Sequence, residues 1–226
     1  MFGNSSSVTS NQDGVHPQLL RHLERHRKHS YDKPVAAHTR QAFEAMLAVW
    51  QQLGRPPLVL DAACGTGASS LKLARQWPDH LVLGLDQSRH RLAHGPALSE
   101  RPANLLLLRA DVVDFWRLLA QSGMQLARHY LLYPNPWPRK QHLMRRWHGH
   151  PAFALLPQLG GEVECRSNWQ IYVEEFALAL GTLLERPLDV EPVPEGPALT
   201  PFEEKYRASG HALWRCRATL VAGVLR

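Results

Sequence analysis

Short apolar runs that alternate with helical patterns are the feature that most constrains the fold of this chain. Each run is bounded by turn residues, and each intervening segment carries apolar side chains at helical spacing. This alternation is typical of βαβ units, which build a parallel sheet with helices on both faces. The predicted strands are 58–62, 81–85, 105–108 and 130–133, and the predicted helices between them are 68–77, 88–100 and 111–122.

The second half of the chain continues this pattern with a helix that ends near residue 159, a strand at 162–166, a helix at 169–184 and a last strand at 213–221. Residues 187–201 are rich in proline, and the segment is too short to separate two domains. We therefore expect it to form a loop over the edge of the sheet. Residues 56–226 then make up one α/β domain.

The first 55 residues have a different character. Residues 1–14 are rich in Ser, Asn and Gly, and this composition predicts a flexible tail. Residues 15–55 predict a basic helical extension, in which a first helix carries Leu19 and Leu23 among arginines and histidines and a second spans 39–53. The basic face of the first helix is either a solvated surface or a binding surface for RNA or a partner chain.

Composition narrows the classes of protein that fit. The formal net charge of +6 favours polyanionic partners, although a high arginine content can also reflect codon usage. No apolar run reaches the ~18 residues that cross a bilayer, and the polar start does not resemble a signal peptide. Three cysteines without a CxxC pair indicate neither a disulfide framework nor a zinc site, and no other metal-ligand set is evident. We expect a soluble, cytoplasmic protein.

A glycine-containing turn follows the first predicted strand. Gly65 and Gly67 stand where the chain passes from strand to helix, and glycine lets the backbone turn tightly and approach a ligand. Asp86 ends the second strand, where a carboxylate can accept the hydroxyl groups of a ribose. Glycine turns after strands are common, but together with Asp86 this one predicts a nucleotide-like ligand.

Further residues favour S-adenosylmethionine (SAM) over a dinucleotide. Ser70 stands where a third glycine would contact a pyrophosphate, and Asp61 in the strand can bind an ammonium group directly or through water. Asp111 follows the third strand, where its side chain could accept from an adenine amino group. Each aspartate alone could be a helix cap or a surface charge. Together they lie at the carboxyl ends of successive strands, where open α/β sheets bind ligands.

The segment after the fourth strand is the most specific in the chain. Residues 133–146 read YPNPWPRKQHLMRR, and this segment resembles the PDPWxKxxHxxRR motif of the bacterial tRNA (guanine-N7)-methyltransferase family. Ser167-Asn-Trp is similar to the family's Thr-Asp-Trp, and Thr200-Pro-Phe-Glu to its Thr-x-Phe-Glu. The resemblance covers about residues 58–220. It implies a Rossmann-like class I SAM-dependent methyltransferase with a mostly parallel seven-stranded sheet and an antiparallel last strand.

The resemblance also implies residue roles. SAM would be the cofactor and tRNA the partner, with the chain acting as a monomer or a homodimer. Asp61, Gly65, Gly67, Asp86 and Asp111 would contact SAM. Asn135 would be the catalytic residue and also border the cofactor, while Arg139, Asn168, Thr200 and Glu203 would face the substrate. The charge of this run separately predicts a groove for RNA lined by Arg139, Lys140, His142, Arg145 and Arg146, unless Arg145 and Arg146 lie on a solvated helix face. Trp137 would either pack on the core or stack on a base.

Two positions depart from the family pattern. Asn135 and Asn168 stand where the family has aspartate. Guanine N7 needs no general base, because its lone pair can attack a methyl group directly, so catalysis can rest on positioning. An amide instead of a carboxylate leaves a guanine N–H group without its acceptor, which weakens recognition by about 1 to 3 kcal/mol.

Three hypotheses follow from these departures. The first is an active guanine-N7 methyltransferase that tolerates both asparagines. The second is an exocyclic-amine methyltransferase, because Asn-Pro-Trp is similar to the Asn-Pro-Pro-aromatic motif of those enzymes. The third is a catalytically silent paralogue that binds SAM or RNA.

Overall fold

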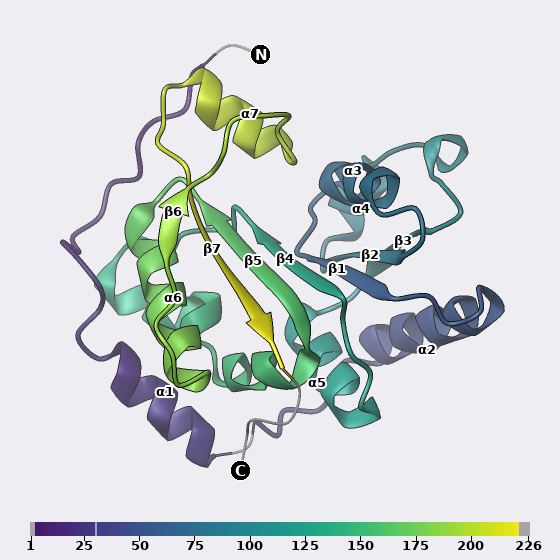
Figure 1. Ribbon diagram of the computed structural model, residues 1–226, viewed down its shortest axis with the longest axis horizontal. Helices are drawn as coiled ribbons and strands as arrows, with labels where there is room; N and C mark the ends of the chain where they lie inside the picture. The colour runs from purple at the N-terminus through teal and green to yellow at the C-terminus, as the bar shows by residue number, and fades with distance from the viewer. Residues whose placement is uncertain (1–2, 30, 222–226) are drawn as a thin grey trace.

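The computed structural model describes residues 3–29 and 31–221, and a single seven-stranded sheet runs through it (Figure 1). The strand order is β3-β2-β1-β4-β5-β7-β6. Strands β1 to β5 pair in parallel, and β7 runs antiparallel to β5 and β6. The predicted parallel sheet with an antiparallel last strand is confirmed. The strands are β1 Leu58–Ala62, β2 Leu81–Asp86, β3 Leu105–Arg109, β4 Arg128–Leu132, β5 Gly161–Ser167, β6 Val190–Pro192 and β7 Trp214–Leu220.

The helices cover the two faces of this sheet unequally. The larger core lies on the face that α1, α2, α5 and α6 cover, and the smaller core lies under α3 and the segment that precedes β7. Successive side chains of β1 point to opposite faces of the sheet, so Leu58 and Leu60 lie in the larger core and Val59 lies in the smaller one. The α-helices are α1 Leu19–Lys28, α2 Ala37–Gln52, α3 Ala68–Gln76, α4 Arg89–Ala93, α5 Val112–Ser122, α6 Gln170–Leu183 and α7 Pro201–Ala208.

The N-terminal extension is part of the same folded unit. Leu19 and Leu23 of α1 and Phe43 and Met46 of α2 are buried in the larger core, and Phe43 packs edge-on against Phe115 of α5. The arginines of α1 lie on its exposed side. The extension therefore shares its apolar core with the sheet.

Residues 3–14 lie against the domain as an extended segment (Figure 1). The Ser5 amide donates to Ser209 Oγ at 3.1 Å, and Ser10 Oγ donates to the Pro138 carbonyl at 2.5 Å. Gln12 is almost fully buried. The composition of this segment predicts a flexible tail and gives no indication of these contacts, because their partners lie far away in the sequence.

Two predicted helices are shorter or tighter in the structure. The segment predicted as a helix at 88–100 contains α4 and a separate 3-10 turn, η1 Leu98–Glu100. Pro96 lies between them, and proline cannot donate the hydrogen bond that a continuous helix requires. The predicted helix that ends near 159 is a series of 3-10 helices, η2 Lys140–Arg145, η3 Trp147–Gly149 and η4 Pro151–Leu159.

The segment 187–201 is more structured than its proline content predicts. It contains β6, which forms the edge of the sheet and ends at Pro192. An edge position tolerates proline because one side of the strand has no pairing partner. Helix α7 follows directly, with Thr200 as its N-cap and Pro201 at its first position.

One part of the sheet carries ion pairs in place of a covering helix. In Figure 1, strands β4, β5 and β7 lie in front with no helix drawn over them. Arg166 pairs with Glu164 at 2.6 Å, and Arg215 pairs with Glu191 at 2.9 Å. Arg128 on β4 pairs with Glu162 on β5. Opposite charges within β5 and on neighbouring strands let this face meet water without a second core layer.

Candidate active site

The loop between β1 and α3 places backbone amide groups at the carboxyl edge of the sheet. Ala63, Gly65 and Gly67 all have positive φ angles, of 58°, 64° and 84°. A Cβ on Gly67 would come within 2.7 Å of the Leu107 side chain, whereas Gly65 has open space at the same position. Glycine is therefore required at 67 for packing. At 65 it leaves the backbone open to a ligand.

Asp61 lies below this loop and is 1% exposed. Its Oδ2 accepts hydrogen bonds from Ser69 Oγ at 2.6 Å and Ser70 Oγ at 2.7 Å. Burial raises the pKa of Asp61 to about 6, although the two serine hydrogen bonds act in the opposite direction. A cation placed beside this carboxyl would favour its charged form. The serine that replaces the third glycine of a dinucleotide motif thus anchors the carboxyl group.

Asp86 fixes the glycine loop from the end of β2. Its Oδ2 accepts from the Gly65 amide at 3.0 Å, and its Oδ1 accepts from the Ser88 amide at 2.8 Å and from Arg91 at 2.9 Å. The Asp86 side chain is buried, whereas that of Arg91 is 58% exposed. An exposed arginine loses little when it swings away. One oxygen of Asp86 is therefore available to another donor.

Asp111 caps the next helix. Its Oδ1 accepts from the Asp114 amide at 3.1 Å at the start of α5, and Gln87 donates to its Oδ2. The Asp111 amide in turn donates to Thr39 Oγ1 on α2 at 2.9 Å. Asp111, for which the sequence predicts a ligand contact, is thus a helix cap in the structure. It is half-buried and lies at the end of β3 beside Asp86.

The loop after β4, residues 134–140, carries the most specific sequence motif and has a constrained backbone. Tyr133 and Trp137 adopt positive φ angles of 49° and 46°, which cost energy for residues with large side chains. Asn135 is exposed, and its Oδ1 accepts from the Trp137 amide at 3.3 Å. Arg139 is exposed as well. The loop therefore presents an amide and a guanidinium group to solvent.

Trp137 is half-buried and has a cation on its face. The Arg145 guanidinium lies 4.6 Å from the centre of the ring, and His142 packs edge-on at 5.5 Å. An arginine over an indole face is a stabilising cation–π contact. The ring therefore packs within this basic group and retains an exposed portion.

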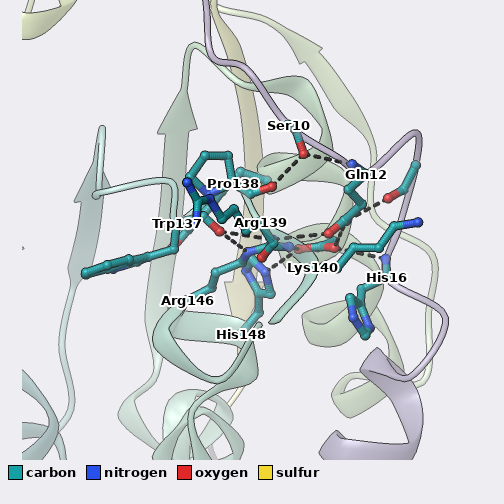
Figure 2. Close-up of polar contacts among 12 residues, drawn as sticks. Ser10, Gln12, His16, Trp137, Pro138, Arg139, Lys140, Arg146 and His148 are labelled. Carbon is teal, nitrogen blue, oxygen red and sulfur yellow. Dashed lines mark hydrogen bonds and ion pairs between the residues drawn. The ribbon is translucent and has the colours of Figure 1, made fainter. Parts of the chain in front are cut away.

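Arg146 does not belong to the basic groove that the sequence predicts. Its side chain is fully buried and forms an ion pair with Glu175 of α6. Figure 2 shows the guanidinium between the N-terminal segment and the loop 134–140. Burial opposes ionisation of Glu175, but hydrogen bonds and charge from His148 and Arg146 outweigh it and hold its pKa at about 2. The sequence does not reveal this role of Arg146, because its partner is a buried carboxylate on another element.

Asn168 follows β5, and its Nδ2 lies 3.1 Å from His211 Nδ1. His211 Nε2 is 3.0 Å from the Ser5 carbonyl, so the N-terminal segment reaches this side of the site too. Asn168 is half-buried. It comes to the same edge of the sheet as the loop 134–140, because the Tyr133 amide donates to the Arg166 carbonyl at 2.9 Å.

Thr200 and Glu203 lie inside the protein, at the start of α7. Thr200 Oγ1 accepts from the Glu203 amide at 2.9 Å, which is an N-cap hydrogen bond. The Glu203 carboxylate is fully buried, and both of its oxygens have arginine partners, Arg166 at 3.0 Å and Arg207 at 2.7 Å. These contacts hold α7 on the sheet.

The structure thus gathers the predicted residues into two groups at one edge of the sheet. Asp61 lies near the end of β1 and Asp86 ends β2, while Gly65 and Gly67 follow β1 and Asp111 follows β3. Asn135, Arg139 and Asn168 follow β4 and β5. The first group fits SAM, because it combines an open backbone at Gly65 with three carboxyl groups, and SAM carries ammonium, hydroxyl and amino groups that can donate to carboxylates.

Sequence patterns do not identify several residues that shape this site. Ser69, Gln12, Arg166, Glu175 and His148 all hold it from within. Ser69 binds Asp61 eight residues away, whereas the partners of Gln12, Glu175 and His148 are distant in the chain and give no local signal. Within residues 3–29 and 31–221, the side chains contain no group of three or more potential metal ligands, and no helix is long and apolar enough to cross a membrane.

The strand order and the carboxyl-edge site together define a Rossmann-like class I methyltransferase. Solved structures agree at the level of fold. An antibiotic-related methyltransferase superposes with a TM-score of 0.55 at 12% identity, covering 83% of this chain and 96% of that one. The 16S rRNA methyltransferase KamB superposes with a TM-score of 0.53 at 19% identity, covering 76% and 93%.

Sequence comparisons identify the family. The profile of a family described as putative methyltransferases matches residues 55–216. The tRNA (guanine-N(7)-)-methyltransferase of Pseudoalteromonas atlantica is 30% identical over 171 residues, 70% of each chain. The enzyme of the same name from Neisseria gonorrhoeae is 28% identical over 172 residues, 70% of this chain and 69% of that one. This chain belongs to the tRNA (guanine-N7)-methyltransferase family.

Proposed function

We propose that this protein transfers the methyl group of SAM to N7 of a guanine in tRNA. The observation that carries the proposal is the meeting, at one edge of the sheet, of a carboxyl-lined glycine loop and an exposed motif with Asn135 and Arg139. The putative-methyltransferase profile spans residues 55–216, and relatives with the tRNA (guanine-N(7)-)-methyltransferase name align with 70% of this chain. The net charge of +6 also suits a polyanionic substrate.

We assign the cofactor contacts to the first group of residues. Asp61 would hold the ammonium group, Asp86 the ribose hydroxyls after Arg91 moves aside, and Asp111 the adenine amino group. Gly65 and Gly67 would let the backbone follow the ligand closely. When bound, SAM supplies an electrophilic methyl group, which the N7 lone pair takes in line with the leaving sulfur.

The residues after β4 and β5 would hold the base. N7 carries no proton, so no side chain has to act as a general base, and orientation is the main task of the protein. Asn135 can accept a guanine N–H through its Oδ1, and Arg139 can contact the RNA backbone. Asn168 would lie beside the base. Thr200 and Glu203 would act indirectly, by positioning α7.

The test is methyl transfer from labelled SAM to unmodified tRNA, with nucleoside analysis by mass spectrometry. The expected product is N7-methylguanosine. A methylated exocyclic amine would identify the Asn-Pro-Trp motif as an amine-methylating site. SAM binding without transfer to any nucleoside would identify a silent binding protein.

Asn135→Asp tests the hydrogen-bond acceptor that residue 135 offers to guanine. A carboxylate offers a second acceptor to guanine and offsets the positive charge that grows on the methylated base, so we expect the kcat/KM for tRNA to rise by about tenfold. The carboxylate can still accept from the Trp137 amide, so the backbone of the loop should not change. Asn4→Asp, at an exposed position of the N-terminal segment, serves as a control for added negative charge. A fall in kcat/KM for Asn135→Asp would show that the amide donor itself contacts the substrate.

A further inference from the structure

The N-terminal segment reaches the loop 134–140 from more than a hundred residues away in the sequence. Figure 2 shows Ser10 and Gln12 beside this loop, with the Arg146 side chain between the N-terminal segment and the loop. Three prolines at 134, 136 and 138 leave the loop with few N–H donors of its own, and Trp137 has a strained backbone. Such a loop holds one conformation only if other parts of the protein fix it.

Contacts from outside fix four successive residues of the loop. Ser10 Oγ donates to the Pro138 carbonyl at 2.5 Å, and Asn11 Oδ1 accepts from the Lys140 amide at 3.0 Å. Arg146 donates to the Trp137 carbonyl at 3.1 Å and to the Arg139 carbonyl at 3.3 Å. Backbone atoms on both sides of Arg139 are therefore tied to groups outside the loop.

Gln12 connects the two sets of contacts. Its Oε1 accepts from Arg146 at 3.1 Å, and its Nε2 donates to Glu175 at 2.5 Å and to the Gly14 carbonyl at 2.7 Å. The His16 amide donates to the same Glu175 oxygen at 2.9 Å. Because Arg146 and Glu175 are fully buried, this network has little freedom to rearrange.

We propose that residues 10–12 and Arg146 form a clamp that positions the loop 134–140 for the methyl acceptor. The inference rests on the proposed function, because it treats Asn135 and Arg139 as substrate contacts. The clamp residues are positioning residues, which touch neither substrate nor cofactor. Their effect passes through the backbone of residues 137–140, which sets the direction of the exposed side chains.

The principal test uses the full chain with Ser10→Ala and Asn11→Ala combined. These side chains are not in the buried core, so the fold should survive. With the loop less well held, we expect kcat with tRNA to fall about tenfold, because misplaced groups cost rate even when binding persists. Calorimetry should give the same affinity for SAM as the wild type, and the thermal midpoint should not change.

A matched control and a second variant sharpen the test. Ser7→Ala removes an exposed hydroxyl from the same segment, and it should leave kcat unchanged. Arg146→Lys keeps the charge beside Glu175 but loses the planar fork that reaches two carbonyls. It should therefore lower kcat as well, and hydrogen exchange of the Lys140 amide should become faster.

Two outcomes would overturn the clamp. Wild-type kcat in the Ser10→Ala/Asn11→Ala protein would show that the loop needs no external support. A parallel loss of kcat, SAM affinity and thermal midpoint would show that these contacts only stabilise the fold. If the wild type itself fails to methylate tRNA, the proposed function fails, and the exchange rate of the Lys140 amide still tests the clamp. Unchanged exchange there in the double variant would then overturn it.

Discussion

At the scale of single residues, Asp86 has two roles, and the substitution of this one residue tests them. It accepts a hydrogen bond from the Gly65 amide, and we assign the ribose hydroxyls of SAM to it. Asp86→Ala should lower the affinity for SAM by about 100-fold or more, because hydrogen bonds to a charged group contribute about 1.5 to 3 kcal/mol each. Calorimetric titration with SAM measures this effect.

The control for Asp86 is Asp79→Ala, in the exposed turn between α3 and β2. It removes the same charge away from the proposed site and should leave the affinity unchanged. Wild-type affinity in Asp86→Ala would contradict the assignment of the ribose contact.

Asp61 predicts a pH dependence of cofactor binding. Burial raises its pKa to about 6, so the carboxyl group is protonated below that pH and charged above it. An ammonium group binds the charged form, so the affinity for SAM should rise with pH, by about tenfold between pH 5 and pH 7. Asp61→Asn should bind more weakly and with no such rise. A wild-type affinity that stays constant over this range would show that Asp61 does not meet the ammonium.

At the scale of elements, α7 depends on one buried carboxylate. Glu203 pairs with Arg166 of β5 and Arg207 of α7, so it joins the helix to the sheet. Glu203→Gln leaves Arg207 without a charged partner and leaves Arg166 with Glu164 alone. The free energy of unfolding should fall by about 3 kcal/mol, as is typical when one member of a buried pair is removed.

Urea denaturation measures this loss. Glu204→Gln, at the exposed neighbouring position on α7, is the matched control and should unfold at the wild-type urea concentration. If the Glu203 variant is as stable as the wild type, α7 is held by other contacts, and Glu203 becomes available for a direct role with substrate.

At the scale of the whole molecule, Glu175 links the N-terminal segment, the 3-10 helices after β4 and α6. Its pKa is held at about 2, well below the ordinary value of 4.5. The charged carboxylate therefore stabilises the fold above pH 4.5, by about 3 kcal/mol, and this contribution is lost as the pH falls toward 2. Glu175→Gln should be less stable than the wild type at pH 7, and the difference should shrink at pH 3.

Unfolding free energies at pH 3, 5 and 7 test this linkage. Glu174→Gln, at a half-buried position outside the network, should lose stability with acid as the wild type does. A pH-independent difference between Glu175→Gln and the wild type would show that the charge of Glu175 is not what stabilises the network.

Local patterns were enough to predict much of this protein. The strand runs, the glycine turn and the aspartates at the ends of the first three strands depend on the periodicity and turn chemistry of neighbouring residues, so the sheet and the grouping of these residues at its carboxyl edge followed from them. The motif at 133–146 indicated the family. The antiparallel last strand and the seven-stranded sheet are likewise confirmed.

Only the tertiary structure decided which polar residues face inward. Arg145 and Arg146 are adjacent and chemically identical, yet one lies over Trp137 and the other is buried against Glu175. Gln12 is buried because a partner from α6 reaches it. Burying a charged or polar group costs free energy unless a partner satisfies it, and here the partners come from distant segments that only folding brings together. Sequence periodicity carries no record of such pairs.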